Sequence, residues 1–325
     1  MRISRRRRYG LILAASAIAI GGIAAGCGDD DDDSSNGGED LSGSITIDGS
    51  STVAPLSEAA AEQFQAENSG VRVTVGTSGT GGGFEKFCRG ETDISDASRS
   101  IKDEEIQACA DAGITYEEIT VGNDGLSVAV NLENDWAQCL TVEQLNAIWG
   151  PDSKVNNWNQ VDPSFPDEEL VLFGPGTDSG TFDFFTEAIN GEEGAQRTDY
   201  NNVGEDDNQA VTGVEGNVGG MAYFGFSFIQ ENEDKVRAVE VDSGNGCVAP
   251  STETVQAGEY TPLGRGLFIY PSGEALQRPE VQGFARFYIE NNDAIAEQAL
   301  AIPLSDDQRE QANEQIDTLV SGGGE

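Results

Sequence analysis

Three short segments gather serine, threonine and glycine in the same local context. They are Asp48–Thr52, Gly76–Gly83 and Gly174–Thr181, and each follows a run typical of a strand and precedes one typical of a helix. Such a loop places hydroxyl and backbone N–H groups at a helix N-terminus, where unpaired amides and the helix dipole favour an anion. Glycine permits close approach of the backbone, and a hydroxyl both donates and accepts. Together the loops predict a site for a tetrahedral oxyanion.

Each loop taken alone has a simpler interpretation. Serine or threonine at a helix start is commonly an N-cap, and a glycine cluster is commonly a turn. The third loop lacks the Gly-Lys of a P-loop, and no dinucleotide-binding fingerprint is complete. The threefold repetition is what favours a ligand site.

A fourth segment, Asp93–Ser100, supplies a positive charge through Arg99. A planar guanidinium can donate to two oxygens of one oxyanion. The alternative is a surface arginine paired with Glu104 or Glu105, and the sequence leaves both open.

Strand-like and helix-like runs alternate along the chain, which favours an α/β fold with largely parallel sheets. The expected strands are Ser44–Asp48, Val71–Val75, Gly125–Asn131, Leu170–Phe173, Gly220–Phe226, Val236–Val241 and Leu267–Tyr270. The expected helices are Pro55–Gln65, Phe84–Phe87, Thr141–Trp149, Thr181–Ile189, Val281–Tyr288 and one capped by Ser305–Gln308.

The N-terminal segment resembles a lipoprotein signal peptide, residues 1–26. Arginines precede the apolar run Leu11–Ile20, which suits a signal and is short for a membrane span. Small residues then lead to Cys27, whose thiol we expect to be acylated; the alternative is an ordinary cleaved signal with a free Cys27. Residues 27–43 include Asp29–Asp33 and predict an acidic, disordered tether.

The formal net charge is −40, which excludes nucleic acid as a partner because no basic face can neutralise phosphodiesters. A negative charge of this size would also repel an anionic ligand from the protein as a whole. At physiological ionic strength, salt screens charges that lie more than about 8–10 Å away, so nearby hydrogen-bond donors can determine whether an anion binds. The chain has no histidine and no CxxC spacing, so neither a metal nor another cofactor is expected.

From Ser44 onward the chain resembles the phosphate-binding proteins of the high-affinity phosphate ABC transporter. The motifs GSSTVAPL, GTSGTGGGFEKFC, DISDASRSI, LTVEQLNAIWG, FGPGTDSGTFDFFTEAI and GLFIYPS occur in the expected order. The resemblance implies a type II periplasmic-binding-protein fold, in which a ligand cleft separates two α/β lobes. Lobe I would comprise 44–123 plus 262–325 and lobe II 124–261, with hinges near Val121–Gly125 and Thr261–Leu267.

An exported chain with four cysteines after Cys27 is expected to form disulfides. Three pairings are possible. Under the lobe division that the resemblance implies, Cys88–Cys109 and Cys139–Cys247 are favoured because each pair falls within one lobe.

The resemblance also implies the ligand contacts. These are Ser51 and Thr52 from the first loop, Ser78 and Thr80 from the second, Ser98 and Arg99 from the fourth segment, and Ser179, Gly180 and Thr181 from the other lobe. Some family members carry an arginine where this chain has Pro175, and an aspartate where it has Ser98. We infer that Arg99 replaces that arginine, as in the Ser-Arg branch of the family.

A carboxylate in the cleft would accept a hydrogen bond from the proton that phosphate keeps near neutral pH, its second pKa being about 6, and would repel fully ionised sulfate. Asp178 is the first candidate and Asp96 the second. Asp178 has an alternative role in capping the next helix or orienting Arg99.

We therefore expect a monomeric, non-enzymatic receptor, lipid-anchored outside the cell, that passes inorganic phosphate to the permease subunits of an ABC transporter. The alternatives are a receptor for another oxyanion, a sensor or adhesin on the same fold, and a phosphohydrolase. The last lacks a histidine for acid–base work.

Overall fold

The computed structural model describes residues 41–177, 179–204 and 206–322. The expected signal peptide, most of the tether, Cys27 and Asp178 lie outside these ranges. Within them, none of the helices combines the length and the apolar character needed to cross a membrane.

The strands in chain order are β1 (Ser42–Gly49), β2 (Gly70–Gly76), β3 (Ile94–Ala97), β4 (Ile119–Asn131), β5 (Cys139–Thr141), β6 (Val171–Gly174), β7 (Asn201–Asn202), β8 (Gly220–Gly225), β9 (Val236–Ala238), β10 (Glu240–Asp242), β11 (Cys247–Val248) and β12 (Gly264–Pro271). The α-helices are α1 (Ala54–Glu67), α2 (Thr80–Phe87), α3 (Asp103–Asp111), α4 (Val142–Trp149), α5 (Gly180–Phe185), α6 (Asp207–Glu215), α7 (Phe226–Gln230), α8 (Thr252–Gln256), α9 (Pro279–Glu290), α10 (Asn292–Gln298) and α11 (Asp306–Gly322). Short 3₁₀ turns η1 (Trp158–Gln160) and η3 (Ala275–Gln277) and a π turn η2 (Thr186–Asn190) complete the set.

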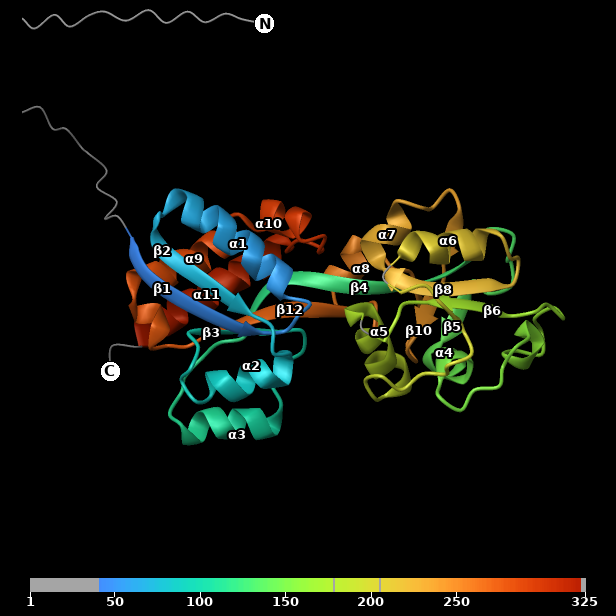
Figure 1. The fold of residues 1–325 in the computed structure, drawn as a ribbon, viewed down its shortest axis with the longest axis horizontal. Coiled ribbons are helices and arrows are strands. Elements are labelled where there is room, and N and C mark those ends of the chain that lie inside the picture. The colour runs from blue at the N-terminus through green and yellow to red at the C-terminus, as the bar shows by residue number, and fades with distance from the viewer. Residues whose placement is uncertain (1–40, 178, 205, 323–325) are drawn as a thin grey trace, which may run out of the picture. The chain divides into compact units, whose positions relative to one another are not determined.

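Among the described residues, nine strands form one mixed sheet in the order β2-β1-β3-β12-β4-β8-β6-β7, with β9 also paired to β4. The pairs β1–β2, β1–β3 and β6–β8 are parallel, as expected. The centre is not: β12 is antiparallel to β3 and β4, and β4 is antiparallel to β8. The expectation of a largely parallel sheet was wrong there because the chain leaves along β4 and returns along β12 (Figure 1).

Two main groups of buried apolar residues define the two lobes. A terminal core, drawn from both ends of the described chain, includes Ile47, Phe64 and Phe284. A central core from the middle of the chain includes Trp149 and Tyr223, whose rings meet edge to face at 4.9 Å. Strand β4 contributes Val121 to the terminal core and Val128 to the central core, and therefore connects the lobes.

Two capping boxes expected from the sequence are confirmed. The Thr141 hydroxyl accepts from the Gln144 N–H at 3.1 Å, and the Gln144 side chain accepts from the Thr141 N–H at 2.9 Å. The Ser305–Gln308 pair repeats this arrangement at the start of α11. Each box satisfies two amides that the first turn of a helix leaves unpaired.

Two expected elements differ in the structure. The single strand Val236–Val241 is divided into β9 and β10, because β9 pairs with β4 while β10 pairs with β5 in a separate three-stranded sheet. The helix Thr181–Ile189 is α5 followed by the π turn η2, in which the Thr186 hydroxyl bonds to backbone carbonyls of α5.

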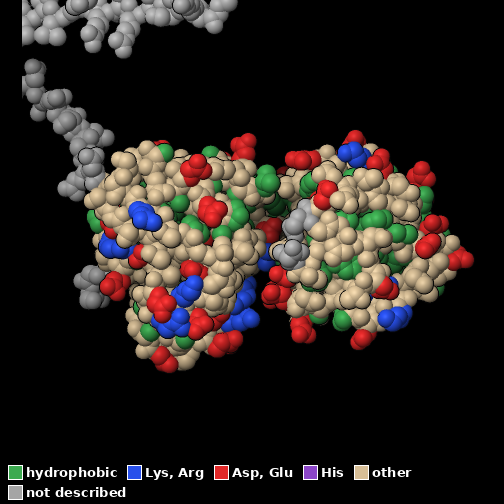
Figure 2. All heavy atoms as spheres, viewed as in Figure 1, with side chains coloured by type: hydrophobic (Ala, Val, Ile, Leu, Met, Phe, Trp, Pro, Cys, Tyr) green, Lys and Arg blue, Asp and Glu red, His purple; other side chains and the backbone are tan. Residues whose placement is uncertain are grey.

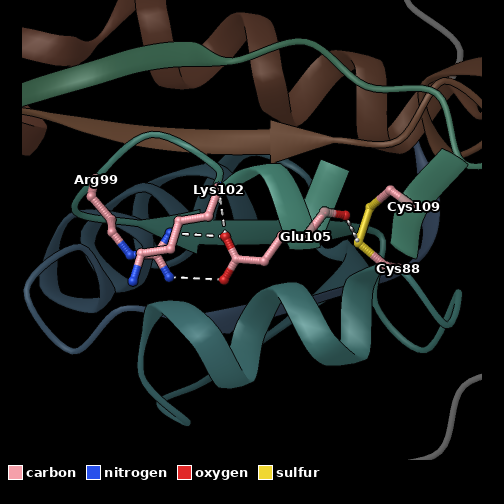
Figure 3. The surroundings of a disulfide bond; sticks show 5 residues. All are labelled: Cys88, Arg99, Lys102, Glu105 and Cys109. Carbon is pink, nitrogen blue, oxygen red and sulfur yellow. Dashed lines mark hydrogen bonds and ion pairs between the residues drawn. A yellow bond between two sulfur atoms is a disulfide. The ribbon is translucent and has the colours of Figure 1, made fainter. Parts of the chain in front are cut away.

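Both favoured disulfides are present. Cys88–Cys109 ties the end of α2 to α3, a helix that the sequence analysis did not predict and whose one buried residue is Cys109 (Figure 3). Cys139–Cys247 joins β5 to β11 across a separation of 108 residues. Cys88 and Cys109 belong to a small third apolar cluster in lobe I, whereas Cys139 adjoins Leu140 of the central core, so each bond braces one lobe.

Candidate functional site

The first loop packs against the neighbouring strand β3. Gly49 has φ +150°, and a Cβ there would lie 2.0 Å from the carbonyl oxygen of Asp96, so only glycine fits. The same carbonyl accepts the N–H of Ser50 at 2.9 Å. Helix α1 has Val53 as its N-cap and no side-chain cap. The hydroxyls of Ser51 and Thr52 are therefore not consumed as caps.

The second loop packs directly on the first. A Cβ on Gly83 would lie 2.6 Å from the Gly49 Cα, so a glycine lets α2 approach this closely. The Ser78 N–H and hydroxyl both donate to the Asp48 carboxylate. Helix α2 also lacks a side-chain cap, and the Thr80 hydroxyl lies 3.2 Å from that of Ser98.

The third loop differs because its serine is a cap. The Ser179 hydroxyl accepts the Thr181 N–H at 3.3 Å, and Ser179 is 5% exposed. Gly180 is exposed, and a Cβ there would lie 3.9 Å from the Thr52 hydroxyl oxygen. The first and third loops therefore face each other across the space between the lobes.

Adjoining cavities occupy that space, and the two that the predicted loops line most fully have volumes of about 350 and about 330 Å³. They share Ser51, Thr52, Gly180 and Arg265. Every predicted contact residue that the structure describes lines one or both: Ser51, Thr52, Ser78, Thr80, Ser98, Arg99, Ser179, Gly180 and Thr181.

Arg99 is paired with Glu105, as the alternative interpretation of the sequence expected, and it also borders the cleft. It lines the larger cavity, and it forms a bidentate pair with Glu105, with both N–O distances 2.8 Å (Figure 3). Burial raises the pKa of Glu105, but the hydrogen bonds from Arg99 and the Lys102 backbone outweigh it and leave the pKa below its usual value. The pair fixes the guanidinium at the cavity wall as a charged group.

The family follows from comparison with known proteins. A family model described as "PBP superfamily domain" matches residues 34–292. The chain is 47% identical over 263 residues to Protein SphX of Synechococcus elongatus, covering 80% of this chain and 77% of that protein. It is 38% identical to the phosphate-binding protein PstS of Staphylococcus saprophyticus, covering 95% of this chain and 94% of that one. The chain belongs to the PstS family.

The fold agrees with this membership. The crystal structure of a possible phosphate binding protein from Planctomyces limnophilus superposes with a TM-score of 0.80 at 43% identity, covering 86% of this chain and 99% of that one. Like its relatives, this PstS-family protein has the type II periplasmic-binding-protein fold, two α/β lobes with a ligand cleft between them.

The lobe II wall of the cleft carries acids that the sequence did not single out. Asp183, Glu187 and Glu193 line the larger cavity, and none of the three forms an ion pair with another described residue. Burial, with the charges of Glu193 and Glu187 nearby, raises the pKa of Asp183. Lys and Arg side chains gather on the lobe I side of the gap, and Asp and Glu side chains face them (Figure 2).

Arg265 on β12 was also missed, although it lines both cavities. It pairs with Asp124 on β4 at 3.0 Å. One available signal was its position: it stands alone between two glycines, at the start of a strand predicted to cross between lobes.

Asp96, the second candidate for a proton-accepting acid, lines neither cavity. It is fully buried beneath the first loop, where one carboxylate oxygen accepts from the Ser57 hydroxyl at 2.9 Å. Burial raises its pKa to about 8, against the opposing hydrogen bond from Ser57. Asp178, the first candidate, falls outside the described residues.

Proposed function

We propose that this protein captures inorganic phosphate outside the cytoplasm and delivers it to the permease of an ABC transporter. One observation carries the proposal: hydroxyl-bearing loops from two lobes and a fixed guanidinium line the same cleft. The relatives named PstS are phosphate-binding proteins of the same family.

The chemistry of the cleft suits a small oxyanion. Hydroxyls of Thr52, Thr80 and Ser98 and the backbone of Gly180 would donate to the phosphate oxygens, and Arg99 would contribute charge. Neutral donors and helix N-termini act over short distances, so they can bind an anion inside a chain of net charge −40. Closure of lobe I (44–123 plus 262–325) on lobe II (124–261) would exclude water from the site.

Calorimetry of the purified, lipid-free protein against phosphate and sulfate tests this proposal. We expect phosphate to bind and sulfate to bind much more weakly, because acids in the cleft would accept a hydrogen bond from the proton that phosphate retains and would repel an ion that has no proton to donate. Equal affinity for the two anions would rule out the proton-acceptor argument, and the absence of phosphate binding would rule out the function.

We further propose that the protein is a receptor without catalytic activity. The chain has no histidine, and the hydroxyls of the cleft have no histidine base beside them. Incubation with a phosphate monoester should release no more phosphate than a control without protein. Release above that control would favour a hydrolase.

The membrane anchor is the last part of the proposal. Cys27 follows a small-residue run after a signal-like segment, so we propose that it is acylated and that the mature protein is a monomer tethered outside the membrane. Mass spectrometry of the mature N-terminus tests the acylation, and a Cys27→Ser chain should be released from the membrane fraction.

A further inference from the structure

Arg265 lies on the strand pair that connects the two lobes. In the β12–β4 register it stands opposite Asp124. Its side chain is 16% exposed and contacts one group from each lobe, the Thr52 hydroxyl of the first loop and the Phe184 ring of α5. It therefore lies where the walls of the cleft meet.

The hydrogen bonds of Arg265 leave one end of its guanidinium uncommitted. Nε and Nη2 donate to Asp124 Oδ2 at 3.2 and 3.0 Å, and Nη2 also donates to Thr52 Oγ1 at 3.3 Å. An arginine has five N–H donors. Within residues 41–177, 179–204 and 206–322, the two at Nη1 have no hydrogen-bond partner.

Arg99 provides the contrast. Glu105 accepts from both of its terminal nitrogens, and Nη1 also donates to the carbonyl of Ser100. Both arginines line the larger cavity, but in Arg265 an entire terminal nitrogen remains available.

The surroundings of Arg265 favour a bound anion. The Phe184 ring lies 3.6 Å from the guanidinium carbon, covers one face of the group and limits its hydration. Because the Thr52 hydroxyl accepts from Nη2, its own hydrogen is free to point at a ligand in the cavity.

We propose that Arg265 is a second anion-binding guanidinium of the cleft, donating through Nη1 to a phosphate oxygen while Asp124 holds its orientation. This inference rests on the proposed function. Because Arg265 belongs to a connecting strand, it would hold the anion from the floor of the cleft while the lobes close over it.

The first test is calorimetry of the purified protein with inorganic phosphate. Arg265→Gln should weaken binding by about 100-fold, and Arg265→Lys by about tenfold, since lysine keeps the charge and loses the planar fork. Arg286→Gln, an arginine on α9 paired with Asp317, is the matched control and should leave the dissociation constant unchanged.

The outcomes separate the two proposals. A wild-type protein that does not bind phosphate contradicts the proposed function. A wild-type protein that binds, with an unchanged dissociation constant in the Arg265 variants, overturns this inference alone. Should Arg265→Gln fail to fold, as judged by thermal unfolding, the Arg265→Lys variant decides in the same way.

A double-mutant cycle distinguishes direct contact from an effect exerted through Thr52. Arg265→Gln is measured again in a Thr52→Val background, which removes the hydroxyl that Arg265 touches. A loss that remains about 100-fold in both backgrounds supports contact with the anion. A loss that disappears in the Thr52→Val background would show that Arg265 only orients Thr52, and the proposal would be wrong.

Discussion

The two walls of the cleft handle acidic residues in opposite ways. On the lobe I side, cations are paired with the acids: Glu105 with Arg99 and Asp48 with Lys86. Burial raises the pKa of Asp48, but the hydrogen bonds from Lys86 and Ser78 outweigh it, so the carboxylate stays ionised and compensated. On the lobe II side, Asp183, Glu187 and Glu193 have no described cation partner.

This difference explains how a strongly acidic protein can keep an anion site. The wall that would bind the anion has its negative charges cancelled locally, and its hydroxyls are not consumed as helix caps. The acidic wall faces the basic one: Glu187 is close enough for its charge to add to the raised pKa of Arg99, although the hydrogen bond from Glu105 is the larger cause. The lobe II acids would therefore attract the cations of lobe I, which favours closure of the cleft. They would also repel ligands that carry more negative charge.

The largest expected effect is the loss of the fixed cation on the lobe I wall. Arg99→Ala should weaken phosphate binding by about 3 kcal/mol, because it removes a partner of the anion and leaves Glu105 uncompensated beside it. Calorimetry checks this. Arg89→Ala, an exposed arginine paired with Glu85 and Glu91, is the control and should bind normally. An unaltered dissociation constant for Arg99→Ala would mean that its role is structural.

A second prediction concerns the acid that the lobe I side keeps buried. Because burial raises the pKa of Asp96 to about 8, the folded protein holds a proton that the unfolded chain releases near pH 4. The stability from this proton is complete below that pH and is lost as pH rises toward 8. Asp96→Asn should therefore gain stability relative to wild type as pH rises, by about 1.4 kcal/mol for each pH unit between pH 5 and 7.

Urea unfolding at pH 5, 6.5 and 8 measures this difference. Asp152→Asn, at an exposed turn, should show no such trend. A gap between Asp96→Asn and wild type that is constant with pH would mean that Asp96 is ionised in the folded protein.

The third prediction is that a hydroxyl on the lobe I wall contributes more to phosphate affinity than a hydroxyl on the lobe II wall. Thr52→Val removes a hydroxyl that no helix uses as a cap, and we expect about tenfold weaker phosphate binding. Thr181→Val should cost less, because Thr181 lines only the smaller cavity, whereas Thr52 lines both. Equal losses of affinity, or a larger loss for Thr181→Val, would contradict the larger contribution proposed for the lobe I wall.

The smallest expected effect comes from neutralising the acidic wall. Glu187→Gln should tighten phosphate binding by about threefold at low salt. The gain should vanish in 0.5 M salt, because the Debye length there is only about 4 Å and exposed charges are screened. Titrations at the two ionic strengths check this, with the exposed Glu290→Gln on α9 as control. Weaker binding by Glu187→Gln would instead show that its attraction for Arg99 dominates.

The sequence predicted the loops well because loop chemistry is local. The Thr141–Gln144 capping box and the strand–loop–helix order depend on residues within a few positions of each other. Helix α3 was missed although it begins with three acids, because its single buried residue is a disulfide cysteine and it shows no apolar face of several residues. Local signals also could not divide Val236–Val241, since the division depends on which distant strand each half joins.

The sequence by itself determined the α/β class, the hydroxyl-rich loops and the candidate cation Arg99, because backbone geometry, capping and charge are properties of short segments. Only the tertiary structure decided that Arg99 is held by Glu105, that Arg265 reaches the same cavity from β12, and that the acids of lobe II face the site with no cation partner among the described residues. Those features depend on side chains separated by up to hundreds of residues, and only the packing of two lobes around connecting strands brings them within a few ångströms.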